Sequence, residues 1–429
     1  MRVDNSKICP ILNAKIMSQS LEELPVIVQL ANKNSELEKG IKSLSTKVKS
    51  NLPLINGIAC SLTTDTIYRL ASSPDIEYIS FDSKIFTQLD IATYSIKANY
   101  PHSLGYNGEG VTVAVIDTGV APHYDLTRPN NRIIGFKDFV NNRTSPYDDN
   151  GHGTQVAGII AGNGYSSRGK YVGVAPKSNI LAIKALDAEG SGNTSNIISA
   201  ISYIVNTKDT YGTKVINLSI GSPANSSCKK DPLCRAVIEA MNKGITVVVA
   251  AGNSGPNNGT ILSPGINPNV ITVGASNDNR TVDIADDTIA SFSSRGPTIE
   301  GASKPDLVAP GVNINSLSNI QLDGYGSSSG TSMATPFVAG SAALLLEKEK
   351  SLSPKEVKKK LMNSCVNLND SRESQGAGLL DLEKLFYVKE TEKKEEKVEE
   401  VARKKPPKKD EDMFEMILVL ILVMMMLDR

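Results

Sequence analysis

Short, nearly continuous apolar runs alternate with helical stretches along most of this chain, which predicts buried strands separated by helices. Between residues 94 and 387, strands are predicted at 111–116, 179–185, 214–220, 245–251 and 270–275, and helices at 152–161, 194–205, 233–242 and 331–349. The predicted strands are rich in β-branched residues, which is typical of a parallel sheet covered by helices on both faces. The pattern therefore predicts an α/β domain over 94–387.

A different pattern precedes this region. Strands are predicted at 25–30, 52–62 and 76–89, and helices at 34–44 and 64–72. This β-α-β-α-β order with short connections favours a small α+β domain of ferredoxin-like type over 21–93. Residues 1–20 hold no apolar core of a signal peptide, so they are predicted to be a leader without a secretory signal.

The composition changes twice near the end of the chain. Residues 388–412 are rich in Lys and Glu and predict a solvated linker, and residues 413–429 form an apolar tail. A helix needs about 20 apolar residues to span a bilayer, and the uninterrupted run at 416–427 is shorter than that. The tail is therefore predicted to be either an interfacial or self-associating segment or a short membrane anchor.

Lysines precede this tail, and they bear on location. They are Lys404, Lys405, Lys408 and Lys409. If the tail anchors the chain in a membrane, the positive-inside rule would keep the α/β domain on the cytoplasmic side. Export by a non-classical route is the alternative.

Composition narrows the possible functions. The 429 residues hold 46 Lys and Arg against 46 Asp and Glu, and this zero net charge gives no basis for nucleic-acid binding. The three His do not cluster, which argues against a zinc site. The five Cys are scattered and predict free thiols, although Cys228 and Cys234 are close enough in sequence to pair in an oxidising compartment.

Four polar residues lie at the carboxyl ends of predicted strands or at the start of a helix, where parallel sheets carry their binding and catalytic residues. Asp117 ends one predicted strand, His152 opens a helix between two glycines, Asn253 follows another strand, and Ser332 lies in the first turn of the helix 331–349. A serine becomes a nucleophile when a base removes its proton, a carboxylate orients that base, and a donor stabilises the oxyanion. The four residues fill these four roles.

Each of these residues also has a structural interpretation. Asp117 suits a turn, Ser332 and His152 suit helix starts, and Asn253 suits a glycine-rich loop. The sequence Asp-Thr-Gly at 117–119 is also the signature of aspartic proteases, which need two such carboxylates. The chain has one Asp-Thr-Gly, so that alternative would require a dimer.

Chain order distinguishes the serine-hydrolase architectures. Here the order is Asp, His, Ser, whereas α/β-hydrolases run Ser, Asp, His and chymotrypsin-like proteases run His, Asp, Ser. With its motifs, the chain from about 94 to 386 resembles the subtilisin-like serine proteases, or subtilases. The motifs are Val-Ile-Asp-Thr-Gly at 115–119, Asn-Gly-His-Gly-Thr at 150–154, Ala-Ala-Gly-Asn-Ser-Gly at 250–255 and Gly-Thr-Ser-Met-Ala-Thr-Pro at 330–336.

Two further segments are similar to those of bacterial alkaline subtilases that lack a signal peptide. They are Pro-Tyr-Asp-Asp-Asn-Gly at 146–151 and Ala-Ser-Phe-Ser-Ser-Arg-Gly-Pro at 290–297. The resemblance implies a three-layer α/β/α core with a seven-stranded, mainly parallel sheet. It also implies that Asp117 orients His152, that His152 is general base and then acid, that Ser332 attacks, and that Asn253 with the Ser332 N–H binds the oxyanion.

The resemblance further implies how peptides bind. Ser219, Ile220 and Gly221 on one side, and Gly190, Ser191 and Gly192 on the other, would flank an extended substrate as added strands. The family pocket beside 219–221 often accepts large apolar side chains, but the sequence does not give its depth. The first domain would be a propeptide that acts as intramolecular chaperone and inhibitor, removed by self-cleavage between Phe86 and Ser95.

The resemblance implies no cofactor for the chemistry. Asp125 matches a position that binds structural calcium in some members, with a solvated aspartate as the alternative. The sequence thus predicts a serine endopeptidase acting on proteins or peptides. The non-enzymatic alternative is an inactive scaffold held at a membrane by its tail.

Overall fold

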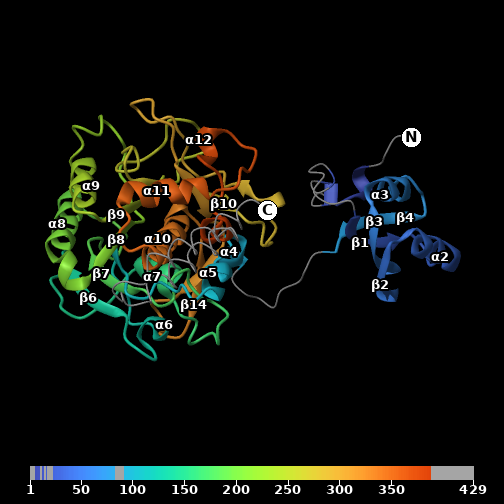
Figure 1. Cartoon of the computed structure of the whole chain (residues 1–429), viewed down its shortest axis with the longest axis horizontal. Coiled ribbons are helices and arrows are strands. Elements are labelled where there is room, and N and C mark those ends of the chain that lie inside the picture. Colours follow the sequence, from blue (N-terminus) through green and yellow to red (C-terminus); the bar gives the residue numbers. More distant parts are fainter. Residues whose placement is uncertain (1–4, 10–11, 14–15, 17–22, 83–90, 388–429) are drawn as a thin grey trace, which may run out of the picture. The chain divides into compact units, whose positions relative to one another are not determined.

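The computed structural model describes residues 5–9, 12–13, 16, 23–82 and 91–387. The predicted linker and apolar tail at 388–429 lie outside these residues, as does most of the predicted leader. None of the described helices is both long enough and apolar enough to cross a membrane. The first domain and the α/β domain each have their own sheet and helices (Figure 1).

The first domain is a four-stranded antiparallel sheet with two helices. Its elements are β1 (Glu23–Leu30), α2 (Ser35–Leu44), β2 (Lys47–Leu52), β3 (Gly57–Thr63), α3 (Thr64–Ala71) and β4 (Ile76–Phe81), in the sheet order β2-β3-β1-β4. Alternate residues of β1 are buried against β3 and the helices. Asn34 caps α2, because its side chain accepts hydrogen bonds from the N–H groups of Glu36 and Leu37.

The single strand predicted at 52–62 was wrong. Two strands, β2 and β3, meet there through a 3-10 turn at Pro53–Ile55, with Asn56 in the left-handed region at φ 46°. The resulting β-α-β-β-α-β order is that of ferredoxin-like domains. The sequence Lys-Val-Lys-Ser-Asn-Leu gave no apolar signal because β2 is an edge strand whose residues are almost all exposed.

The α/β domain is built on one sheet with the strand order β11-β10-β9-β8-β5-β7-β6, in which β12 also pairs with β10. Its strands are β5 (Thr112–Asp117), β6 (Ile133–Asp138), β7 (Asn179–Lys184), β8 (Thr213–Leu218), β9 (Thr246–Ala250), β10 (Ile271–Asn277), β11 (Thr288–Ile289) and β12 (Leu307–Pro310). All pairings are parallel except the antiparallel one between β10 and β11. The described sheet therefore has eight strands, one more than the implied seven.

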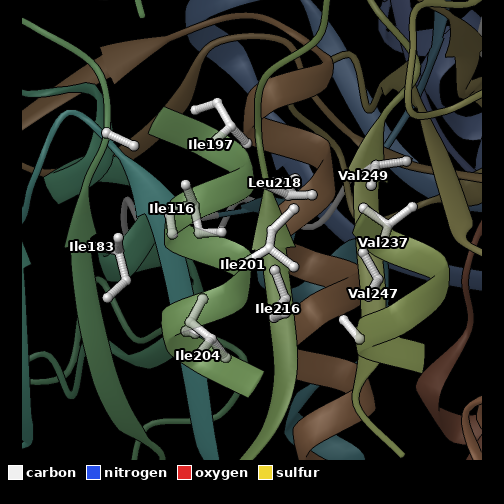
Figure 2. Close-up of a cluster of buried hydrophobic side chains, with 14 of the residues drawn as sticks. Ile116, Ile183, Ile197, Ile201, Ile204, Ile216, Leu218, Val237, Val247 and Val249 are labelled. Atoms are coloured by element: carbon white, nitrogen blue, oxygen red, sulfur yellow. The ribbon is translucent and has the colours of Figure 1, made fainter. Parts of the chain in front are cut away.

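Helices cover both faces of this sheet and make the predicted three-layer core (Figure 1). On one face lie α8 (Thr194–Tyr211) and α9 (Pro232–Asn242), and on the other lie α7 (His152–Ala161) and α10 (Thr331–Lys348). Figure 2 shows Ile197, Ile201 and Ile204 of α8 packed onto apolar side chains of the central strands. Burial of this apolar area is the main favourable term in folding.

The other described elements are short. They are the 3-10 helices Asn5–Lys7 and Ile284–Asp286, the helices α4 (Ile91–Ser95), α5 (Asn99–Ser103), α6 (Tyr124–Thr127), α11 (Pro354–Asn363), α12 (Arg372–Gln375) and α13 (Leu382–Phe386), and the hairpin of β13 (Ile314–Leu317) and β14 (Tyr325–Ser328). Parallel pairing brings the carboxyl ends of β5, β8 and β9 to one edge of the sheet, where α7 and α10 begin.

Candidate active site

Asp117 and His152 form the centre of this edge. Asp117 is the last residue of β5 and is fully buried, and His152 is the first residue of α7. His152 Nδ1 lies 2.7 Å from Asp117 Oδ1, which also accepts a hydrogen bond from the Thr118 N–H. The His152 side chain keeps 29% of its surface exposed. Its Nδ1 is thus occupied by a carboxylate while part of the ring reaches solvent.

Asp148 organises the loop that joins these two residues, a role that the sequence analysis missed. Its carboxylate accepts hydrogen bonds from the Thr118 hydroxyl, the Gly151 N–H, and both the N–H and the hydroxyl of Thr154. Gly151, at φ 107°, occupies a backbone region that favours glycine and lets the chain turn into α7. The available signal was the position of Asp148 in the run 146–151.

Two opposing effects act on the pKa of His152. Burial lowers it, whereas the charge of Asp117, its hydrogen bond to the ring and the charge of Asp148 raise it. The net result is a pKa above the ordinary 6.5. The carboxylates therefore stabilise the imidazolium that a general base becomes when it takes a proton.

Ser332 is the second residue of α10, where backbone N–H groups have no partner within the helix. Its hydroxyl donates to the Ser219 carbonyl at 2.9 Å, and the Ser219 hydroxyl donates back to the Ser332 carbonyl at 2.9 Å. Within the described residues, no hydrogen bond joins Ser332 to His152. Both side chains nevertheless line the same cleft.

Asn253 lies across from the start of α10. Its Oδ1 accepts hydrogen bonds from both the N–H and the hydroxyl of Thr331, at 2.9 and 3.0 Å. Since the oxygen is engaged, the Nδ2 group is the part of this amide that is available as a donor to the cleft. This suits the stabilisation of negative charge beside Ser332.

A cleft of about 730 Å³ joins these residues. All six residues predicted to flank a substrate line it, namely Gly190, Ser191, Gly192, Ser219, Ile220 and Gly221. Leu186, Ile197 and Leu233 add an apolar wall. Asp117 is not among the lining residues, because it lies buried behind His152.

The surroundings of Asp125 do not fit a calcium ion. One carboxylate oxygen accepts from the Ser166 N–H at 2.8 Å and the other from the Tyr325 hydroxyl at 2.7 Å, so both are engaged. In the part of the chain that the structure describes, no group of three or more His, Cys, Asp or Glu side chains is arranged to hold a metal. Calcium prefers six to eight oxygen ligands, so no calcium is assigned to this position.

Comparisons with known proteins identify the family of this chain. The model of the subtilase family matches residues 108–379. Serine protease AprX of Bacillus subtilis is 43% identical over 363 residues, which cover 80% of this chain and 81% of that protein. An alkaline protease of Shouchella clausii is 37% identical over 329 residues, covering 76% of this chain and 78% of that protein.

Solved structures of subtilisin-like proteases are similar to this chain as well. Sphericase superposes with a TM-score of 0.58 and 32% identity, over 70% of this chain and 100% of that chain. A cold adapted subtilisin-like serine proteinase gives a TM-score of 0.53 and 35% identity, over 64% of this chain and 90% of that chain. The aspartic-protease alternative is wrong, because the proteins similar to this chain are serine proteases and Asp117 pairs with a histidine.

Proposed function

Because this chain belongs to the subtilase family of serine peptidases and hydrolyses peptide bonds, we propose that Asp117, His152 and Ser332 are its catalytic triad. The observation that carries the proposal is the 2.7 Å contact between His152 and a buried Asp117, at the cleft that Ser332 lines. No cofactor is needed for this chemistry.

The resting hydrogen bond of Ser332 must change for the reaction to begin. Rotation about its Cα–Cβ bond would move the hydroxyl from the Ser219 carbonyl toward His152 Nε2. The nucleophile–base bond is often long or misaligned in substrate-free serine hydrolases and tightens with substrate. Because Asp117 holds Nδ1, the tautomer that leaves Nε2 free to accept a proton is favoured.

The proposed reaction then follows in two halves. Ser332 Oγ attacks the peptide carbonyl carbon while His152 takes its proton, and the Asn253 Nδ2 and Ser332 N–H donate to the oxyanion. His152 returns the proton to the leaving amine, which releases one product and leaves an acyl ester on Ser332. Water, activated by His152, hydrolyses that ester and frees the second product.

We further propose that the first domain is a propeptide that the enzyme removes itself and that inhibits it in the meantime. Self-cleavage was predicted between Phe86 and Ser95. Residues Ile91–Ser95 form helix α4, in which Ala92 and Ser95 are buried. A protease that binds extended chains cannot use a buried helix, so we expect the cut before Ile91, in a segment outside the described residues.

The test is the intact mass of the purified full-length chain after incubation, for the wild type and for Ser332→Ala. We expect the wild type to lose about 85 to 90 N-terminal residues, by the position argued above, and the variant to stay whole. If the variant is processed like the wild type within the same preparation, Ser332 is not the nucleophile.

A serine-directed fluorophosphonate probe completes this test. Labelling of the wild type but not of Ser332→Ala identifies the reactive residue even where the propeptide stays attached. An unlabelled wild-type chain that also stays whole would favour the inactive-scaffold alternative. Contact of the tail at 413–429 with a membrane, with the protease domain on the cytoplasmic side, remains a proposal from composition.

A further inference from the structure

The segment Ile261–Ser263 contributes Leu262 to the cleft that Ser332 lines, and it is hydrogen-bonded to both sides of that cleft. The Leu262 N–H donates to the Ala251 carbonyl at 2.9 Å. Ser263 exchanges two backbone hydrogen bonds with Ser222, at 2.8 and 3.0 Å. Ala251 precedes the wall that carries Asn253, and Ser222 follows the wall that carries Ser219, so this segment closes the space between them.

The Leu262 side chain fills that space. A Cβ atom added to Gly221 would lie 2.9 Å from Leu262 Cβ, and one added to Gly252 would lie 2.6 Å from Leu262 Cγ. Leu262 thus touches one glycine from each wall. It is half-buried and lines the cleft, whereas its neighbour Ile261 is buried in a separate apolar cluster.

This space is where one substrate side chain must go. We define the acyl residue as the substrate residue whose carbonyl carbon lies beside Ser332 Oγ and whose carbonyl oxygen points toward Asn253 Nδ2. Ser219 is hydrogen-bonded to Ser332 and Asn253 to Thr331, so the segments 219–221 and 252–254 form the two walls next to the nucleophile. The side chain of the acyl residue would therefore enter between these walls. The glycines at 221 and 252 leave room for it, and Leu262 takes that room.

We infer that Leu262 is the specificity-determining residue of this protease and restricts the acyl residue to small side chains such as alanine. The inference rests on the proposed role of Ser332. It departs from the large apolar side chains that the resemblance leads one to expect. A branched four-carbon side chain at the floor excludes an aromatic ring, since close-packed walls yield little without strain.

The experiment uses the full-length chain and two peptide p-nitroanilides that differ only in the acyl residue, alanine or phenylalanine. Active enzyme is counted by fluorophosphonate labelling, and kcat/KM is measured for both substrates. The wild type should favour alanine by at least about tenfold. Leu262→Gly, and to a smaller degree Leu262→Ala, should shift the ratio toward phenylalanine by about 10- to 200-fold.

Ile261→Val is the matched control, because residue 261 points into the core, and it should leave the ratio unchanged. A wild type that labels but cleaves the phenylalanine substrate as well as the alanine one overturns the inference. So does a folded Leu262→Ala or Leu262→Gly chain with an unchanged ratio. A wild type that does not label contradicts the proposed triad instead, and the two failures are thereby distinguished.

Discussion

In the proposed mechanism His152 takes the proton of Ser332, and the surroundings of His152 set the pH range in which it can do so. The pKa of His152 is raised above 6.5 by Asp117 and Asp148 against the effect of burial. A general base acts only when neutral, so activity is lost as the pH falls through this raised pKa. We expect kcat/KM to rise about tenfold per pH unit on the acid side, to reach half of its maximum at a pH above 6.5, and to level off at higher pH.

Asp148→Asn tests the electrostatic part of this prediction. Removing that charge should move the midpoint to lower pH, because Asp148 is one of the groups that raise the pKa. Asp209→Asn is the control, since the Asp209 side chain is 91% exposed and lies on the remote end of α8. A midpoint that both variants leave unchanged would mean that Asp148 acts through loop geometry alone.

At the residue scale, the candidate catalytic residues could be predicted from the sequence, but the shape of the cleft could not. Asp117, His152, Asn253 and Ser332 could be picked out because each is a polar residue in a glycine-rich motif at the end of a predicted element. Leu262 could not, because a leucine in a loop gives no signal until Gly221 and Gly252 are folded against it. The rotamer of Ser332 is likewise a property of the folded site.

At the scale of elements, the pairing of β10 with β11 places two acidic residues side by side. Ser276 lies opposite Ile289 and Asn277 opposite Thr288, so the same register brings Asp278 opposite Asp287. Both are buried, and neither carboxylate oxygen of Asp287 has a hydrogen-bond partner among the described residues. Burial, with the charges of Asp278 and Asp286, raises the pKa of Asp287 to about 8.

This raised pKa predicts that the fold loses stability as the pH rises. The folded chain keeps the proton of Asp287 up to about pH 8, whereas the unfolded chain releases it near 3.8. Between these values the folded state binds more protons, so the free energy of unfolding falls with increasing pH. Asp287→Asn has no proton to lose and should be more stable than the parent by about 1–3 kcal/mol at pH 8, with little difference at pH 4.

Thermal unfolding at pH 4, 6 and 8 would measure this, in the Ser332→Ala background to prevent self-digestion. Asp209→Asn is again the control and should show no pH-dependent gain. If the gain of Asp287→Asn over the parent is no larger at pH 8 than at pH 4, the pKa of Asp287 is not raised in the folded chain and the prediction is wrong.

Elements were predictable where their burial was one-sided or complete. The bounds of α7 were predicted correctly. The helix predicted at 194–205 runs on to Tyr211, and the prediction stopped short because the last turns carry polar residues. The strands β2 and β6 were missed because they lie at sheet edges, where exposed positions remove the apolar signal. The short β11 and β12 were missed because a few residues carry no periodicity.

At the scale of the whole molecule, the described residues that line the cleft end at Ser332, well before the tail. We therefore expect truncation after Tyr387 to leave kcat/KM within about twofold, since none of the cleft residues that the structure describes is removed. If the tail is an anchor, the full-length chain should sediment with anionic vesicles and the truncated chain should not. A truncated chain that folds but loses activity would show that the tail supports the site.

The predicted division into domains depended on changes of pattern along the chain, which the sequence displays directly. The contacts between side chains and neighbouring loops could not be predicted from these changes of pattern, and the contacts of Lys184 are the clearest example. This fully buried lysine at the end of β7 donates to the Thr118 carbonyl, the Leu186 carbonyl and, at 2.5 Å, Asp149. One ammonium group thus joins the turn after Asp117, the loop before His152 and the entry to the 190–192 wall.

This shared cation has a consequence for engineering and for divergence among relatives. Loops around the cleft are natural units for grafting a new specificity from one protease to another. Here three of them terminate on the same charge, so a graft that brings a loop without an acceptor for Lys184 leaves a buried ammonium short of a partner. Recombination of these loops should succeed in sets that keep residues 149 and 184 compatible, and fail when they are exchanged singly.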